Sequence, residues 1–249
     1  DGRGGECERA MVAPEDGPAA WEARYAPPGA DGRSGKGSRG RTAAKAAPRE
    51  EWYATFEEIY PVLQLYLREE FKAARILHVG CGLSRLAEGL WRNGYTNIVN
   101  VDASESAIRA CRERDAHLQG VEYLCMDATD LSRFPESSFD FVIDKAFLDA
   151  IFSTIAGVRS VSRTLQGISR VLRPGGYYLS ISASPKHCRY THFKRPQFEW
   201  AVDSVRVAND PGAFVYACRK RAFHREWFFG DPGALELKRE AEQAWNGLA

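Results

Sequence analysis

The stretch Ile76-Leu77-His78-Val79-Gly80-Cys81-Gly82 decides the fold of this chain, together with Ile98-Val99-Asn100-Val101-Asp102 further on. The first is an apolar strand that runs into a Gly-x-Gly turn, where backbone amides and a helix N-terminus can approach a ligand closely. The second is an apolar strand that ends in a carboxylate, which places an acceptor where a ribose presents its hydroxyl groups. Together they predict a nucleoside-binding α/β sheet.

The residues after the turn narrow the choice of ligand. A dinucleotide-binding fingerprint has a third glycine three residues after the second, and Arg85 stands at that position here. A pyrophosphate is therefore disfavoured, and the sequence favours a nucleoside without phosphate, of which S-adenosylmethionine is the common one. A strand-turn-helix that uses its glycines for steric reasons alone is the alternative at this point.

The composition predicts one folded domain without a large charge imbalance. The chain has 249 residues, 44% of them hydrophobic, and a formal net charge of +1. One hydrophobic core is expected, and a globally basic nucleic-acid-binding protein is excluded. No apolar run approaches ~18 residues, so no membrane-spanning segment is predicted. The six cysteines form no Cys-x-x-Cys pair; we expect reduced thiols in a cytoplasmic protein and no metal site.

The composition also divides the chain into three parts. Residues 1–50 are rich in Gly, Ala, Pro, Arg and Ser and are interpreted as a mostly flexible basic segment. Within it, Trp21 and Tyr25 are large aromatic residues that need a surface to pack against. Residues 51–221 carry the regular apolar patterns of a folded domain, and residues 222–249 form a C-terminal tail.

Within residues 51–221, strands and helices alternate. Helices are expected at 83–93, 104–118 and 158–172, between strands that begin at 76, 98, 121, 138 and 177. This alternation predicts a doubly wound, mostly parallel sheet with ligands at the carboxyl ends of the strands. Residues 200–207 and 213–218 then predict an antiparallel hairpin, because only a short turn separates two strands. The result is the seven-stranded, Rossmann-like class I methyltransferase arrangement.

Several short motifs then point to a family. They are Trp21-x-x-Arg24-Tyr25, Glu51-Trp52-Tyr53, Gly80-Cys81-Gly82, Phe139-Asp140-Phe141-Val142-Ile143-Asp144-Lys145, Leu148-Asp149-Ala150, Val171-Leu172-Arg173-Pro174-Gly175-Gly176 and Ser182-Ala183-Ser184-Pro185. In these motifs the chain resembles the class I lysine methyltransferases that act on translation elongation factor 1A, including the endothelin-converting-enzyme-associated member. The family usually has Gly-Thr where this chain has Ala146-Phe147.

The resemblance implies S-adenosylmethionine as cofactor and a set of residues that bind it. Those residues are Trp21, Tyr25, Trp52, Gly80, Asp102, Ala103, Asp127, Ala128 and Lys145, with Gly82 in the same turn. Asp102 is expected to accept the ribose hydroxyls and Asp127 the adenine amino group, close to the Ala128 amide. The three aromatic residues would close over the cofactor. Lys145 would meet the methionine carboxylate or donate its backbone carbonyl.

A lysine acceptor adds one demand, because its amine is protonated at neutral pH, with an ordinary pKa of about 10.4. A carboxylate can position the ammonium group, and a partly apolar channel favours the neutral amine. Asp144 and Asp149 are the predicted catalytic residues. Phe147 and Tyr53 could form the walls of such a channel.

The predicted function is therefore an S-adenosylmethionine-dependent protein-lysine N-methyltransferase, with elongation factor 1A as the protein partner that the resemblance implies. The basic and aromatic stretch from Lys186 to Arg195 is either a docking surface for an acidic protein or RNA or a solvated loop. A nucleic-acid partner is less favoured. Two alternatives stay open: a methyltransferase that acts on a small molecule or nucleic acid, and a nucleoside-binding module without turnover.

Overall fold

The computed structural model describes residues 18–26, 51–153, 157–207 and 212–221. Its seven strands form one sheet in the order β3-β2-β1-β4-β5-β7-β6. The strands are β1 (Ile76–Val79), β2 (Ile98–Asp102), β3 (Val121–Cys125), β4 (Phe139–Lys145), β5 (Leu172–Ser182), β6 (Trp200–Arg206) and β7 (Phe214–Lys220). The first five run parallel, and β7 pairs antiparallel with both β5 and β6. The predicted fold class, including the C-terminal antiparallel hairpin, is confirmed.

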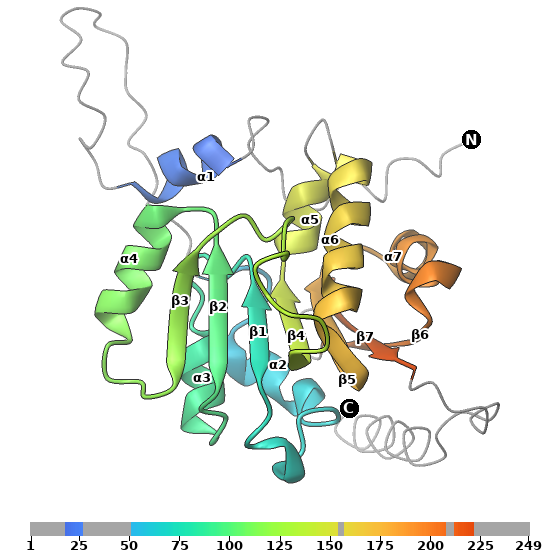
Figure 1. The fold of residues 1–249 in the computed structure, drawn as a ribbon, viewed down its shortest axis with the longest axis horizontal. Helices are drawn as coiled ribbons and strands as arrows, with labels where there is room; N and C mark the ends of the chain where they lie inside the picture. The colour runs from blue at the N-terminus through green and yellow to red at the C-terminus, as the bar shows by residue number, and fades with distance from the viewer. Residues whose placement is uncertain (1–17, 27–50, 154–156, 208–211, 222–249) are drawn as a thin grey trace, which may run out of the picture.

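Helices cover both faces of the sheet (Figure 1). They are α1 (Pro18–Tyr25), α2 (Phe56–Leu63), α3 (Leu86–Arg92), α4 (Glu105–Arg114), α5 (Phe147–Phe152), α6 (Gly157–Val171) and α7 (Lys186–Phe193), with short 3₁₀ helices η2 (Glu69–Phe71) and η3 (Pro196–Phe198). Two of them begin at clear sequence signals. Thr55 and Glu58 form a capping box at the start of α2, and the Ser104 side chain caps α4.

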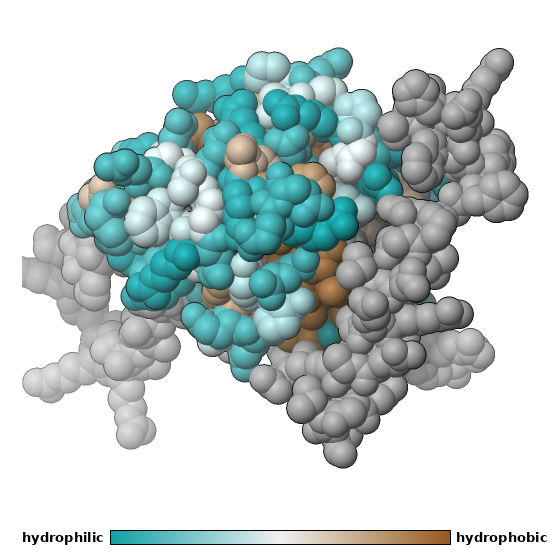
Figure 2. Space-filling view, turned by 90° about the horizontal axis from the view of Figure 1, so that it is seen from below, coloured by the Kyte–Doolittle hydropathy of each residue, from teal (hydrophilic) through white to brown (hydrophobic). Residues whose placement is uncertain are grey.

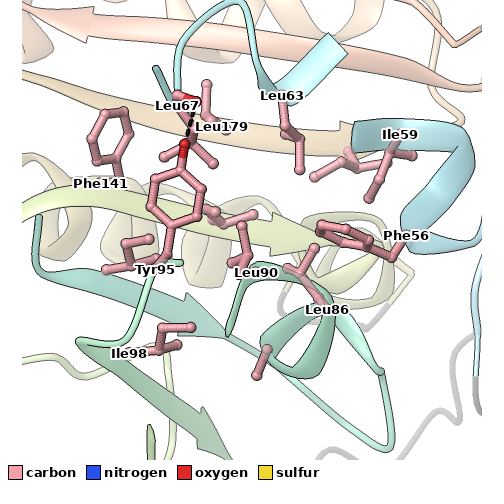
Figure 3. Close-up of a cluster of buried hydrophobic side chains, with 14 of the residues drawn as sticks. Phe56, Ile59, Leu63, Leu67, Leu86, Leu90, Tyr95, Ile98, Phe141 and Leu179 are labelled. Atoms are coloured by element: carbon pink, nitrogen blue, oxygen red, sulfur yellow. Dashed lines mark hydrogen bonds between the residues drawn. The ribbon is translucent and has the colours of Figure 1, made fainter. Parts of the chain in front are cut away.

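Two hydrophobic clusters lie on opposite faces of the sheet, because side chains alternate along each strand. Phe141 and Ile143 of β4 point to the face covered by α2, α3 and α4, whereas Val142 points to the face covered by α5 and α6. Figure 3 shows part of the first cluster, in which Tyr95 lies among aliphatic side chains and donates a hydrogen bond to the Leu67 carbonyl. The sheet therefore holds the carboxyl ends of β1, β2 and β4 rigidly side by side.

Two sequence expectations differ from the structure. The stretch from Lys186 is not a loop: residues 186–193 form helix α7, with Arg189 and Phe193 buried on one side. These residues are four apart, so they lie on the same face of a helix. The cysteines also differ in part: Cys81, Cys111, Cys125 and Cys218 are free, but Cys188 is disulfide-bonded.

The described surface carries few large hydrophobic groups. Seen from the end opposite α1, it is mostly hydrophilic, with a larger hydrophobic area and smaller ones elsewhere (Figure 2). Among the described residues, the large hydrophobic side chain that is exposed to solvent is that of Val158. No helix in these ranges is both long and apolar enough to cross a membrane. The predicted flexible basic segment, residues 1–50, lies outside the described residues except for residues 18–26, and the predicted C-terminal tail, residues 222–249, lies outside them entirely.

Candidate functional site

The turn after β1 brings other side chains very close to its backbone. Gly80 and Gly82 have φ values of +62° and +49°, a region that favours glycine. A Cβ atom at Gly80 would lie 2.3 Å from the Phe147 ring, and one at Gly82 would lie 2.8 Å from the Tyr25 hydroxyl. A side chain at Gly80 would therefore clash with Phe147, and one at Gly82 would strain the backbone, so glycine is favoured at both positions, which lie between α5 and α1.

Asp102, at the end of β2, is held against this turn. Its Oδ2 accepts a hydrogen bond from the Gly82 amide at 2.8 Å, and its Oδ1 accepts one from the Ser104 amide at 2.9 Å. Burial raises the pKa of this carboxyl. A carboxylate offers about four acceptor positions, so Asp102 retains the capacity to accept a hydrogen bond from a ligand hydroxyl. We call Gly80, Gly82 and Asp102 the glycine cradle.

Helix α1 is attached beside the glycine cradle by Glu22. The Glu22 carboxylate accepts hydrogen bonds from the Ser104 hydroxyl at 2.7 Å, from the Ser106 amide at 3.2 Å and from the Ser106 hydroxyl. The bond from Ser104 is the main reason why the pKa of Glu22 is lowered. These donors lie at the N-terminus of α4, where a negative charge is favourable. Glu22 is not among the predicted site residues, and it stands at an unspecified position of the Trp21-x-x-Arg24-Tyr25 motif.

The predicted aromatic residues gather around this helix. The Arg24 guanidinium lies 5.6 Å from the centre of the Trp21 ring and 4.9 Å from that of Trp52. The rings of Trp21 and Tyr25 stack at 6.2 Å. Burial, and next the charge of Asp102, raise the pKa of Tyr25 to about 12. The structure thus brings Trp21, Tyr25 and Trp52 together as a lid beside the glycine cradle.

Lys145, at the end of β4, holds the segment before α2. Its buried ammonium group pairs with Glu51 and donates a hydrogen bond to the Ala54 carbonyl at 3.1 Å. Glu51 in turn accepts a hydrogen bond from the Arg85 amide at 2.7 Å, at the start of α3. In this structure Lys145 therefore positions residues 51–54, and Glu51 is a further site residue that the sequence analysis did not single out.

The end of β3 lies beside that of β2, as the alternating pattern predicts. The Met126 amide donates a hydrogen bond to the Asp102 carbonyl at 2.9 Å. Asp127 is exposed and accepts a hydrogen bond from the Thr129 amide at 2.8 Å, and Ala128 is buried. Ala103 is half-buried and its carbonyl accepts a hydrogen bond from the Cys125 thiol. The structure brings these residues to the same edge as the glycine cradle.

Asp144 is fully buried beneath α5. Its carboxylate accepts a hydrogen bond from the Leu148 amide at 3.2 Å and another from the Tyr178 hydroxyl at 2.5 Å. Burial raises its pKa. These contacts join β4, α5 and β5. In this structure Asp144 therefore fixes the start of α5.

Asp149 is also fully buried, at the centre of a hydrogen-bond network. It accepts hydrogen bonds from the hydroxyls of Tyr53 at 2.9 Å, Ser182 at 2.7 Å and Ser184 at 3.1 Å, and it pairs with the Arg189 guanidinium. Arg189 also donates to the Ser182 hydroxyl at 3.0 Å. We call Asp149, Tyr53, Ser182, Ser184 and Arg189 the Asp149 network. No cluster of three or more potential metal ligands occurs among the residues that the structure describes.

The sheet order, with β7 inserted antiparallel between β5 and β6, and a glycine cradle at its carboxyl edge define the class I fold of S-adenosylmethionine-dependent methyltransferases. Residues 77–180 match a family described as a methyltransferase domain. A solved N-methyltransferase, NodS from Bradyrhizobium japonicum, has the same fold: its TM-score is 0.53 at 17% identity, over 67% of this chain and 96% of that one.

Curated relatives give the narrower family. The bovine (Bos taurus) EEF1A lysine methyltransferase 4 is 32% identical over 186 residues, which cover 72% of this chain and 71% of the relative. The mouse (Mus musculus) eEF1A lysine and N-terminal methyltransferase is 38% identical over 177 residues, or 69% of this chain. The chain spans only 24% of the length of that larger relative. This chain belongs to the methyltransferase family that contains the eEF1A lysine methyltransferases.

Proposed function

We propose that this chain is an S-adenosylmethionine-dependent protein-lysine N-methyltransferase that acts on eEF1A. The observation that carries the proposal is its similarity to the bovine EEF1A lysine methyltransferase 4, which extends over 72% of this chain. The site supports it, because the glycine cradle, which has the residue types expected for a nucleoside site, lies beside a buried polar network at one edge of the sheet.

The residues of the glycine cradle fit the proposed cofactor. Asp102 would accept the two ribose hydroxyls, since its fixed carboxylate retains acceptor capacity beside the Gly82 amide. Asp127 and Ala128 would hold the adenine, and the lid of Trp21, Tyr25 and Trp52 would exclude water. When bound, S-adenosylmethionine supplies the methyl group. Holding donor and acceptor in line is the main task of the protein.

The proposal is tested with methyl-tritiated S-adenosylmethionine, purified eEF1A and the full chain. We expect label in the eEF1A band, traced by mass spectrometry to a lysine side chain and absent with Asp102→Ala. The exposed Glu105→Gln, in the first turn of α4, is the matched control and should label eEF1A like the wild type.

Other outcomes would identify the alternatives. Nuclease-sensitive label from a lysate, or label in small molecules, would indicate a different acceptor class on the same fold. Tight cofactor binding with no labelled product in eEF1A or in the lysate would indicate a nucleoside-binding module and would contradict the proposed function.

A further inference from the structure

The Asp149 carboxylate uses its acceptor positions inside the protein. One oxygen accepts from two serine hydroxyls and pairs with Arg189, and the other accepts from the Tyr53 hydroxyl and, at 3.3 Å, from the Ala183 amide. A carboxylate offers about four lone-pair positions, and these contacts occupy them. The side chain is 0% exposed. An incoming lysine therefore has no position left on Asp149 at which to donate a hydrogen bond.

The charge of Asp149 is also neutralised. The Arg189 side chain is 3% exposed and lies directly against the carboxylate. Burial lowers the pKa of Arg189 to about 10, so that the guanidinium remains charged at neutral pH. A carboxylate that is already paired with a buried cation attracts a second cation only weakly. Asp149 is thus better suited to hold a neighbour than to receive the substrate.

That neighbour is Tyr53, which is only half-buried. Its φ of +65° lies in the left-handed region, which is costly for a tyrosine. The Ala54 amide donates a hydrogen bond to the Trp52 carbonyl at 2.9 Å, which closes a γ-turn around Tyr53. Lys145 donates a hydrogen bond to the Ala54 carbonyl, which fixes the end of this turn. Residues from β4 and α5 therefore hold Tyr53 in one orientation.

The position of Tyr53 links the two parts of the site. Its neighbour Trp52 belongs to the lid and lies against the Arg24 guanidinium, and the Tyr53 hydroxyl reaches Asp149 on α5. Because the hydroxyl hydrogen is donated to Asp149, a hydrogen bond from a ligand to this hydroxyl is one that the phenol oxygen accepts. An N–H group of an amine is the donor that such an oxygen recognises.

We propose that Tyr53 is the catalytic residue that contacts the acceptor amine, and that Asp149 and Arg189 are positioning residues that orient its hydroxyl. The proposal rests on the lysine methyltransferase function proposed above. The phenol oxygen accepts a hydrogen bond from the amine and aligns its nitrogen with the methyl group.

The decisive variant is Tyr53→Phe, which removes the oxygen and keeps the ring. We expect kcat on eEF1A to fall about 10- to 100-fold, as for the loss of a hydrogen bond to a group that is charged or gains charge in the reaction. The cofactor Kd should stay within about twofold of the wild type. Tyr60→Phe is the matched control, because Tyr60 is also half-buried and its ring stacks on Phe56. It should keep the wild-type kcat.

The positioning role is tested by a double-mutant cycle. If Asp149 acts through Tyr53, then Asp149→Asn lowers kcat strongly in the wild type and at most about twofold in the Tyr53→Phe background. Since Asp149→Asn leaves Arg189 buried without its counter-charge and can unfold the protein, Ser184→Ala provides a milder second perturbation of the same carboxylate. It should lower kcat with little change in KM, and again only when Tyr53 is present.

The outcomes separate this proposal from the function on which it rests. If the wild type methylates eEF1A and Tyr53→Phe keeps kcat within about twofold, the role of Tyr53 is refuted and the lysine methyltransferase function stands. Additive effects in the cycle would refute the positioning role of Asp149. If the wild type does not methylate eEF1A, both proposals fail.

Discussion

The glycine cradle and the Asp149 network lie at the same edge of the sheet but are built in different ways. The Asp102 carboxylate is held by backbone amides 20 and 2 residues away in sequence. The Asp149 carboxylate is held mainly by side chains, from residues 96, 33 and 35 positions away. Backbone donors survive almost any substitution, whereas side-chain donors do not. We therefore expect the cradle to tolerate sequence change around it and the Asp149 network to depend on each member.

The largest expected effect is on the cradle. Asp102→Ala removes two charge-assisted hydrogen bonds to the ribose, each worth roughly 1.5–3 kcal/mol, so the Kd of S-adenosylmethionine should rise about 100-fold or more. Isothermal titration calorimetry measures it. A denaturant titration is run alongside, because Asp102 also accepts two backbone amides. A Kd within tenfold of the wild type would show that Asp102 is not the ribose acceptor.

The second effect is on the Asp149 network, and it should appear as a loss of folding stability. Arg189→Met leaves Asp149 buried and unpaired, which should lower the free energy of unfolding by about 3–5 kcal/mol. Urea titration followed by circular dichroism measures this. Arg92→Met is the control: its side chain is 68% exposed, and Glu88 keeps its second pair with Arg85, so the substitution should cost less than ~1 kcal/mol. Equal losses would mean that the Arg189 pair is no more important than the exposed Arg92 pair.

The same contrast explains what the sequence could predict. The strand and turn patterns around Gly80 and Asp102 are local, so they predicted the strands and the sheet correctly. The partners of Asp149 come from β5, α7 and the segment before α2, and no local pattern connects them. Arg189 was part of a basic stretch interpreted as a docking surface or loop. Its spacing of four residues from Phe193 was the available signal that one side of a helix turns inward.

Glu22 and Glu51 were missed for a related reason. Glu51 is named in a quoted motif and Glu22 stands at an unspecified position of another, but their partners lie far along the chain, at Arg85 and Ser104. A carboxylate in a motif does not reveal which helix N-terminus it will reach. The predicted roles of the cofactor-binding residues remain predictions, and the structure adds the contacts by which each can be tested.

A smaller effect tests whether the lid belongs to the cradle. Glu22→Gln should weaken the docking of α1 by about 1 kcal/mol, as for a lost helix cap, and raise the cofactor Kd roughly fivefold. Because the pKa of Glu22 is lowered in the folded state, its contribution is present above the ordinary value of 4.5 and is lost as pH falls below it. Amide hydrogen exchange of residues 18–25 should therefore differ between wild type and variant at pH 7 and converge at low pH.

The control for the lid experiment is Glu57→Gln, an exposed glutamate in the first turn of α2. It should change neither the exchange of residues 18–25 nor the Kd. A difference between wild type and Glu22→Gln that persists well below the lowered pKa would mean that α1 is held by its aromatic contacts and not by the carboxylate.

The smallest effect concerns Ala146, which lies between the end of β4 and the start of α5. Its φ is +69°, and the resemblance described in the sequence analysis implies glycine at this position. The left-handed region costs a residue with a Cβ atom roughly 1 kcal/mol, so Ala146→Gly should raise the free energy of unfolding by up to about that amount. The matched control is Ala150→Gly inside α5, which should lower it by about 1 kcal/mol. If Ala146→Gly is destabilising, then the alanine methyl group, 2% exposed, contributes packing that outweighs its backbone strain, and the junction is adapted to alanine.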